Sequence, residues 1–132
     1  MIGNLEQIDF TGSNLENIDF SASKIKDCTF VNTTLKSANF SHAILVGSNN
    51  FGTSDLVGIN FSASFLQQAK FKGMKIIGLN FTQSNMKEVN FDQSILQDTL
   101  LVSCNLDKSS FVNSLISFFI HFFLIDGRKK KN

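Results

Sequence analysis

The chain contains no proline, tryptophan or tyrosine, and only two cysteines and two histidines in 132 residues. Because proline is absent, no position lacks the backbone N–H that a ladder of strand hydrogen bonds needs. The histidines, His42 and His121, are far apart, and no glycine-rich phosphate loop or cluster of carboxylates is present. These residues cannot assemble a nucleophile–base pair or a metal site. We therefore expect a protein that is not an enzyme, with no catalytic, metal-binding or cofactor-binding residues and no cofactor.

An excess of positive charge, the usual sign of a nucleic-acid-binding surface, is also missing. Four of the twelve cations lie in the last residues, Arg128–Lys131, which leaves eight lysines for residues 1–117. Ten of the eleven acidic residues lie in that same segment, since only Asp126 follows it. The body of the chain is therefore near neutral, and direct binding of nucleic acid is not expected.

What the sequence does contain is an apolar residue at every fifth position, with one interruption after Leu45. At an apolar frequency of 42%, the chance of 23 such positions is on the order of one in a billion. These positions are predicted to form the structural core: Leu5, Phe10, Leu15, Phe20, Ile25, Phe30, Leu35, Phe40, Leu45, Phe51, Leu56, Phe61, Leu66, Phe71, Ile76, Phe81, Met86, Phe91, Leu96, Leu101, Leu106, Phe111 and Ile116.

A period of five fits neither a helix nor a flat strand. It indicates a chain that turns a corner after each unit and points one large side chain inward each time. The residues two before each apolar centre are mostly small or apolar, such as Ser23, Cys28 and Ala38. An inward pair at these two positions is what a short strand followed by a turn presents, because side chains alternate along a strand.

The five-residue units, among them SNLEN, IDFSA, SDLVG, INFSA and SNMKE, resemble the A(N/D)LXX unit of the pentapeptide repeat family. This resemblance implies an all-β fold: a right-handed quadrilateral β-helix, or solenoid, with four repeat units in each coil and nearly six coils. The handedness comes from the resemblance alone. We expect residues 1–117 to form the solenoid and 118–132 to form a separate C-terminal tail.

A second period supports four sides independently, because phenylalanine returns every ten residues. In a 20-residue coil, Phe30 and Phe51 would stack on one side, and Phe40 and Phe61 on the opposite side, with aliphatic columns between them. On the outside, polar side chains are also predicted to form columns, which can hydrogen-bond from coil to coil. We favour this structural role over the alternative of a polar binding strip. The residues of these columns are Asp19, Asn39, Asn60, Asn80, Ser21, Ser41, Ser62 and Thr82.

The two cysteines, Cys28 and Cys104, fall at inward positions nearly four coils apart, or roughly 18 Å, which is too far for a disulfide. Reduced core cysteines suit the cytoplasm. The repeat is already in phase at Leu5, with no charged-then-apolar signal segment before it. We therefore expect a cytoplasmic protein.

The repeat is first interrupted between Leu45 and Phe51, where the step is six residues (VGSNN). One interpretation is a one-residue bulge that the stack tolerates. The other is a kink that shapes a docking face, since Ile44, Val46 and Phe65 fall at outward positions nearby and form a possible interaction surface.

The second interruption is the apolar run Leu115–Ile125, which is too short to span a bilayer. The favoured interpretation is a cap or a homodimer contact at the C-terminal end, because an open solenoid end exposes strand edges. Membrane contact and a truncated or out-of-frame end are the alternatives. The further residues of the possible interaction surface lie here: Leu100, Val102, Val112, Phe118, Phe119, Phe122 and Phe123.

Two main functions agree with these observations. The first is a rigid, non-catalytic scaffold that binds a protein partner whose identity the sequence does not reveal. The second follows from the resemblance to the quinolone-resistance (Qnr-like) branch of the family, whose members mimic DNA and bind DNA gyrase. A DNA mimic needs a continuous anionic face, which Lys24, Lys36 and Lys70 interrupt. Delivery into a host cell, as with some bacterial effectors of the family, is a third possibility without a motif to support it.

Overall fold

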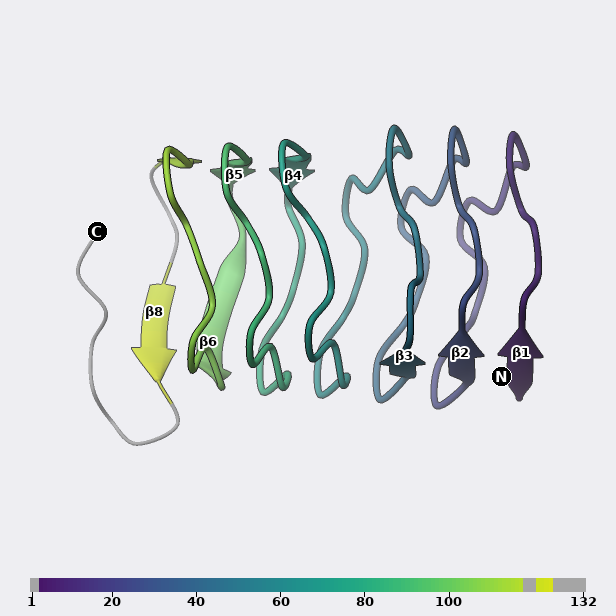
Figure 1. Ribbon diagram of the computed structural model, residues 1–132, viewed down its shortest axis with the longest axis horizontal. Coiled ribbons are helices and arrows are strands. Elements are labelled where there is room, and N and C mark those ends of the chain that lie inside the picture. Colours follow the sequence, from purple (N-terminus) through teal and green to yellow (C-terminus); the bar gives the residue numbers. More distant parts are fainter. Residues whose placement is uncertain (1–2, 118–120, 125–132) are drawn as a thin grey trace.

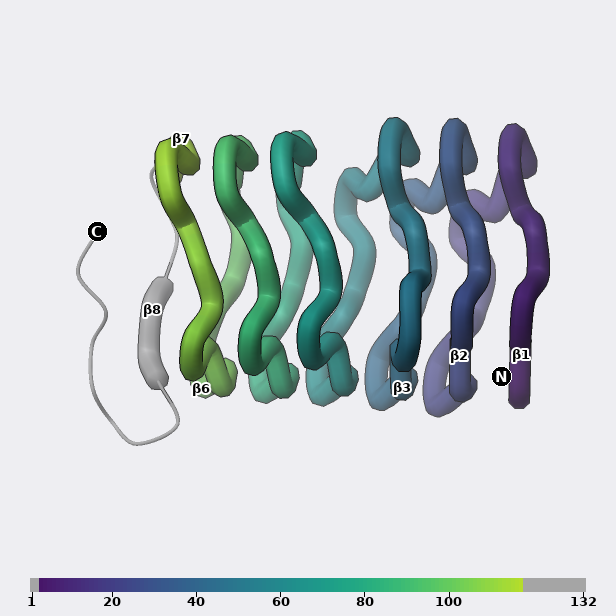
Figure 2. Tube along the Cα trace, in the orientation of Figure 1, coloured from purple at the N-terminus to yellow at the C-terminus, as the bar shows by residue number. Residues whose placement is uncertain are grey.

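The computed structural model of the protein describes residues 3–117 and 121–124, which form short strands joined by tight turns (Figure 1). No helix is present in these ranges. The strands are β1 (Asn4–Glu6), β2 (Lys24–Lys26), β3 (Ile44–Val46), β4 (Lys75–Ile77), β5 (Ile95–Gln97), β6 (Leu100–Cys104), β7 (Leu115–Ile116) and β8 (His121–Leu124). The chain winds repeatedly in the same sense, so that equivalent segments lie side by side along one long axis (Figure 2).

We refer to the successive turns of the chain as coil one (5–24), coil two (25–44), coil three (45–65), coil four (66–85) and coil five (86–105). Neighbouring coils pair in parallel, in three sheets with the orders β1-β2-β3, β4-β5-β7 and β6-β8. Leu5 pairs with Ile25 between β1 and β2, and Ile76 pairs with Leu96 between β4 and β5. Parallel bridges of single residues extend the pairing to the other sides. The predicted 20-residue periodicity is therefore the pairing register of the stack.

The interior contains the predicted columns of stacked phenylalanine rings. The ring centroids of Phe30 and Phe51 are 4.9 Å apart with an interplanar angle of 3°. Rings of the two columns also meet edge to face, as between Phe30 and Phe40 at 6.2 Å and 77°. Offset and edge-to-face pairs are the favourable arrangements of aromatic rings. The prediction that Phe30 and Phe51 stack on one side is thus confirmed.

The core residues of coils two to five are buried, whereas most of those in the first coil are half-buried. Phe20, Ile25 and Phe30 are fully buried, but Leu5 and Phe10 remain partly accessible because no coil covers them on the N-terminal side. Half-buried core positions occur at both ends of the stack: Leu5, Phe10, Leu15, Phe111 and Ile116. The remaining predicted core positions, from Phe20 to Leu106, lie in the buried cluster.

Each corner places the residue two after the apolar centre in the left-handed region, as Ala22 (φ 56°) and Gln83 (φ 61°) show. The asparagine or aspartate before the centre caps the same corner. Its side-chain oxygen accepts the N–H of the second residue after it, as Asn60 does from Ser62 at 2.9 Å. This is the Asx turn that these side chains favour.

The outer polar columns therefore form structural hydrogen bonds, but most of these bonds lie within one corner and few join neighbouring coils. Asn39 Nδ2 does donate to Asp19 Oδ1 at 3.3 Å across neighbouring coils. Most of the asparagine and aspartate oxygens instead bond within their own corner, because the Asx turn brings the N–H two residues on within reach of the side chain.

Candidate functional site: an opened junction between two coils

Coil three is one residue longer than its neighbours, and the pairing register changes there. Before it, Asp19 pairs with Asn39; across it, Thr34 pairs with Asp55, which lies one position further along the chain than the earlier register would place it. From Asn60 the original register returns, with Asn80 as the partner. The six-residue step found in the sequence is thus accommodated by one coil that is longer than the rest.

The side chain of Asn49 takes up the extra length on the side facing coil two. Its Oδ1 accepts the N–H of Cys28 at 2.9 Å, and its Nδ2 donates to the carbonyl oxygens of Ile25 and Val46, both at 3.0 Å. A carboxamide carries the same donor and acceptor as a peptide group. Asn49 therefore substitutes for a backbone unit between coils two and three.

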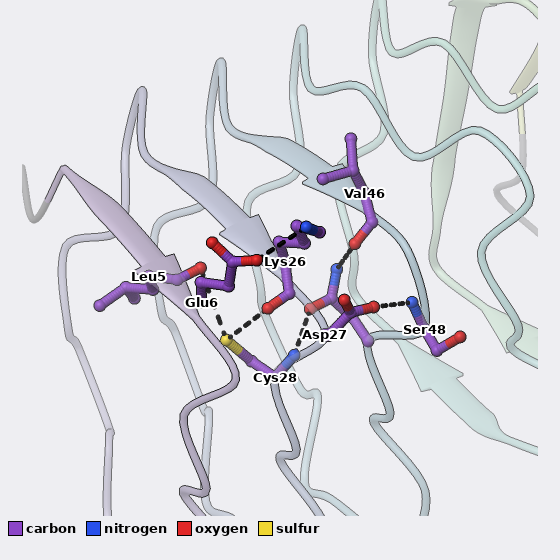
Figure 3. A network of polar contacts seen from close by, with 8 residues as sticks. Leu5, Glu6, Lys26, Asp27, Cys28, Val46 and Ser48 are labelled. Carbon is purple, nitrogen blue, oxygen red and sulfur yellow. Dashed lines mark hydrogen bonds and ion pairs between the residues drawn. The ribbon is translucent and has the colours of Figure 1, made fainter.

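Asp27 holds the turn that carries the extra residue. Its Oδ1 accepts the N–H of Ser48 at 2.7 Å (Figure 3). Its own N–H donates to the carbonyl of Val46 at 3.4 Å. The carboxylate lies over Gly47, where a Cβ would be only 2.1 Å from Oδ1. Gly47 also has a positive φ of 73°. Glycine is thus required here for two reasons, conformation and space.

Further contacts in Figure 3 lie beside this turn and within coils one and two. Lys26 Nζ forms an ion pair with Glu6 Oε1 at 2.7 Å, and the Cys28 thiol contacts the carbonyls of Lys26 and Leu5 at 3.4 and 3.8 Å. The ion pair raises the pKa of Lys26, first through the hydrogen bond to Glu6 and then through its charge. Through Asn49 and Asp27, the side of coil three that faces coil two is well bonded.

The side of coil three that faces coil four is not well bonded. Among residues 3–117, no backbone hydrogen bond or bridge joins segment 46–57 to segment 66–76. The last bond before this gap runs from the N–H of Leu45 to the carbonyl of Phe65 at 2.9 Å, and the first after it from Gly58 to Ile77 at 3.2 Å. The ladder between coils three and four is open between these two points, and the coils are visibly more widely spaced there (Figures 1 and 2).

Comparison with the next junction gives the number of bonds missing. Between coils four and five, Gln68, Phe71 and Gly73 donate to coil five, Asn90 and Ile95 donate to coil four, and β4 pairs with β5 through Ile76. The six equivalent N–H groups at the open junction have no hydrogen-bond partner among the residues that the structure describes: Gly47, Phe51, Thr53, Leu56, Lys70 and Lys75.

The opening leaves a cleft of about 330 Å³ between the coils. The residues that line it lie within 45–51 and 67–70. We refer to the longer open edges that contain them, 45–56 and 67–75, as the coil-three lip and the coil-four lip. The inward residues Ser54, Ala69 and Met74 are only half-buried, whereas the equivalent Ser94 and Val89 of coil five are buried. The cleft thus reaches the layer of small inward side chains.

The ring columns show that the opening is one-sided. Phe51 and Phe71 are 6.1 Å apart, against 4.9 Å for Phe30 and Phe51 on the same column. On the opposite column, Phe61 and Phe81 are 5.4 Å apart, and the bridge from Asn60 to Asn80 is intact. Coils three and four are therefore wedged apart on one side and joined on the other.

The two lips differ in charge and in strain. The coil-four lip carries Lys70, Lys72 and Lys75, all exposed, and none of them forms a salt bridge within the described ranges. On coil three, Thr53 has a φ of 58° and is the one β-branched residue at positive φ in the part of the chain that the structure describes. A β-branched residue in this conformation is a genuine outlier.

An apolar surface lies beside the cleft and consists of the residues predicted to point outward near the interruption. Ile44 and Phe65 are paired across coils two and three and are 41% and 52% exposed, and Val46 is half-buried. We refer to Ile44, Val46 and Phe65 as the apolar patch. The bridge between Ile44 and Phe65 brings two large side chains together on one face, next to the end of the cleft.

The second predicted surface lies on the last coils and is only partly described. Leu100 and Val112 are 37% and 61% exposed, and Val102 is half-buried. Phe118 and Phe119 lie outside the described residues, and the backbone of Phe122 and Phe123 belongs to β8, which pairs in parallel with β6. The parallel stacking therefore continues beyond the end of the five-residue repeat.

The described ranges hold no group of three or more His, Cys, Asp or Glu residues that could bind a metal ion. Cys28 and Cys104 are free, buried thiols, as predicted, and burial raises the pKa of Cys104. In the same ranges no helix is long and apolar enough to cross a membrane.

Two family models match the chain and define its family. The model of the pentapeptide repeat region matches residues 24–94, and the model of eight pentapeptide repeats matches residues 4–41 and 84–114. The chain belongs to the pentapeptide repeat family. No sequence among the curated proteins matches it.

Several solved structures are similar to the chain. A pentapeptide repeat protein (Rfr23) from the cyanobacterium Cyanothece 51142 is 18% identical with a TM-score of 0.50, over 89% of this chain and 86% of that one. A pentapeptide repeat protein of the Arabidopsis thaliana thylakoid lumen is 27% identical with a TM-score of 0.43, over 78% and 61%. Full-length QnrB1, a plasmid-mediated fluoroquinolone resistance protein, is 16% identical with a TM-score of 0.47, over 85% and 71%. The first of these similarities supports the fold.

The sequence located the interruption but did not reveal the open ladder. The signal was the six-residue step in VGSNN together with the lysines that follow in coil four. Whether the extra residue would bulge outward or separate two coils depends on the side chains of Asp27 and Asn49, which belong to different coils.

Proposed function

We propose that the protein is a non-catalytic, rigid scaffold that binds a partner protein through the apolar patch. The observation that carries this proposal is the exposed pair Ile44 and Phe65, bridged across neighbouring coils beside a cleft. Exposed apolar side chains that cluster on a rigid surface are typical of protein–protein contacts. In this proposal the chain acts in the cytoplasm.

The architecture that we propose for the scaffold is the one expected from the repeat: a right-handed quadrilateral β-helix of nearly six coils over residues 1–117. The parallel pairing of equivalent residues and the stacked phenylalanine rings support it. Such a rod presents its surface side chains in fixed positions to a partner, because each coil is held by the coils on either side of it.

We also propose that two copies associate through their C-terminal ends. The exposed side chains of Leu100 and Val112 on the last coils support this. Light scattering of the full chain at tens of micromolar tests it, and a monomer at that concentration would refute it. A gyrase-binding role needs an anionic face, and the exposed Lys70, Lys72 and Lys75 on coil four disfavour it.

The scaffold proposal is tested by chemical cross-linking of the full chain in native cell extract, with mass spectrometry of the captured proteins. Ile44→Ser and Phe65→Ser should each lose a protein that the unmodified chain captures. Ile95→Ser is the matched control, because Ile95 is also the first residue of a strand and is 40% exposed, close to the 41% of Ile44. If Ile95→Ser and Ile44→Ser lose the same proteins, the apolar patch is not the binding surface.

A further inference from the structure

The open junction presents backbone groups that a strand can pair with. On the coil-three lip, the N–H groups of Phe51 and Thr53 are equivalent to those of Phe71 and Gly73, which donate to coil five, but no acceptor among the described residues meets them. On the coil-four lip, the N–H groups of Lys70 and Lys75 are in the same situation. Unpaired backbone groups along an edge are a template for another extended chain, which can complete the ladder.

The positive charge of the coil-four lip favours an extended chain that is acidic. Lys70, Lys72 and Lys75 are exposed and form no salt bridge in the described ranges. The nearby carboxylates of coil five are already engaged, since Glu88 accepts from Gln68 at 2.8 Å and Asp92 accepts from the N–H of Val112 at 2.8 Å. Across the cleft, Asp55 is the one acidic residue of segment 46–57.

The size of the cleft limits the length of the segment that it can hold. Its volume of about 330 Å³ is at the lower end of the range of roughly 300–1,000 Å³ for ligand sites in proteins. Its walls are mixed: the buried side chains of Leu45 and Phe51 are apolar, and Asn50, Gln67 and Gln68 contribute amides. A cleft of this kind accepts a few residues of extended chain with small apolar and hydrogen-bonding groups.

We propose that the cleft between coils three and four binds a short, extended, acidic peptide segment of a partner protein by strand pairing. The peptide backbone bonds to the open N–H and C=O groups of the lips, and its carboxylates pair with Lys70, Lys72 and Lys75. This rests on the proposed scaffold function and deepens it, because it assigns a specific chemistry to one part of the partner. The apolar patch at the end of the cleft contacts the rest of that partner.

The experiment uses the full chain and a short fluorescent peptide in which valine and glutamate alternate, with binding followed by fluorescence anisotropy. A second peptide carries N-methyl groups on alternate residues, which removes backbone donors, and a third has lysine in place of glutamate. The first peptide should bind, and the other two should bind at least about tenfold more weakly, since each loses several paired groups.

Two sets of variants test the site itself. Deletion of Asn49 makes coil three as long as its neighbours and places Ser48 at the inward position, so the ladder should close and peptide binding should be lost. The triple variant Lys70→Gln, Lys72→Gln, Lys75→Gln should weaken binding about tenfold while leaving the ladder open. Its control is Lys24→Gln, Lys36→Gln, Lys108→Gln, which removes the same charge from exposed positions on other parts of the rod and should bind as the unmodified chain does.

The outcomes are distinguishable. No binding of the acidic peptide to the unmodified chain, equal binding of the N-methylated peptide, or equal losses in the two triple variants would each overturn the proposal. Capture of a protein that depends on Ile44 and Phe65 would leave the scaffold function intact in all these cases. If the deletion variant fails to fold, the two triple variants still decide the question, because their substitutions lie on exposed side chains.

Discussion

The junction between coils three and four and the junction between coils four and five join the same kinds of residues, yet only the second is fully bonded. Both have a phenylalanine stacked on a phenylalanine, at 6.1 Å for Phe51 and Phe71 and 5.5 Å for Phe71 and Phe91. The two junctions differ by the one extra residue in coil three. Six backbone hydrogen bonds are missing at the first junction, whereas the ring column continues through it.

This difference shows that backbone hydrogen bonds and apolar ring contacts tolerate the displacement of a coil to different degrees. A hydrogen bond weakens steeply as its geometry departs from the ideal, so a small displacement of one coil breaks a whole row. Contact between apolar rings is less directional and persists when the separation grows by about an ångström. At this junction the apolar columns therefore continue past the open part of the ladder, and they act together with the backbone bonds that remain on the opposite side.

The largest expected loss of stability comes from removing a ring on the better-packed side of the stack. Phe81 is fully buried and touches the rings of Phe61, Phe71 and Phe91. Phe81→Ala should lower the free energy of unfolding by about 3–5 kcal/mol, because it leaves a cavity inside a tight stack. Phe51→Ala should cost less, since one side of this ring already faces the cleft. Urea unfolding of both variants measures the two costs, and an equal or greater cost for Phe51→Ala would contradict the comparison.

Deletion of Asn49 should remove the difference between the two junctions. It restores six bonds and removes the three made by the Asn49 side chain. At about 1 kcal/mol for each net bond, the variant should be more stable by roughly 3 kcal/mol. Hydrogen exchange provides the direct measurement: the amides of Phe51, Thr53 and Lys70 should become as slow as those of Phe71, Gly73 and Asn90. Unchanged exchange at Phe51 would show that the open ladder has another cause.

Two glycines allow the destabilisation caused by a steric clash to be measured separately from that caused by a left-handed backbone conformation. Gly47 and Gly73 both have positive φ, but a Cβ at Gly47 would collide with Asp27, whereas nothing lies within 4 Å of one at Gly73. Gly73→Ala should cost about 1 kcal/mol for the left-handed conformation alone. Gly47→Ala should cost about 1–3 kcal/mol more, because the carboxylate of Asp27 must move and release the N–H of Ser48. Thermal unfolding of the two variants measures this, and equal shifts would mean that Asp27 does not hold the turn.

The smallest effect concerns the corners of coil one, far from the open junction. Hydrogen bonds from the hydroxyl and the N–H of Thr11 lower the pKa of Asp9. Because the pKa is lower in the folded protein, this carboxylate contributes stability above its unfolded pKa of about 4 and loses it as the pH falls. Asp9→Asn keeps the acceptor and removes the charge, so its melting temperature should fall less between neutral and acidic pH. A pH series of melting temperatures for both proteins measures the difference, and parallel curves would show that Asp9 has no part in it.

Much of the fold could be predicted because its determinants are periodic. The five-residue apolar repeat and the ten-residue return of phenylalanine are enough to predict the stacking of Phe30 on Phe51. The position of the extra residue is equally visible in the sequence. Its consequence is not, because it depends on contacts between Asn49 and coil two and on the clearance between Gly47 and Asp27. For a similar reason, the partners of the outer polar columns could not be predicted: repeat spacing shows which side chains are aligned, but not which N–H each oxygen accepts.

The left-handed residue at every corner has a consequence for how such a rod can evolve. Glutamine, asparagine, alanine, serine, histidine and lysine all occupy this position, and none of these side chains is buried. Apart from Gly47 and Asp27, which also contact each other, these positions meet only the requirement for a backbone angle, so the chemistry displayed along each edge can change without disturbing the columns within. Selection for a new binding partner can therefore act on one set of positions while selection for folding acts on another.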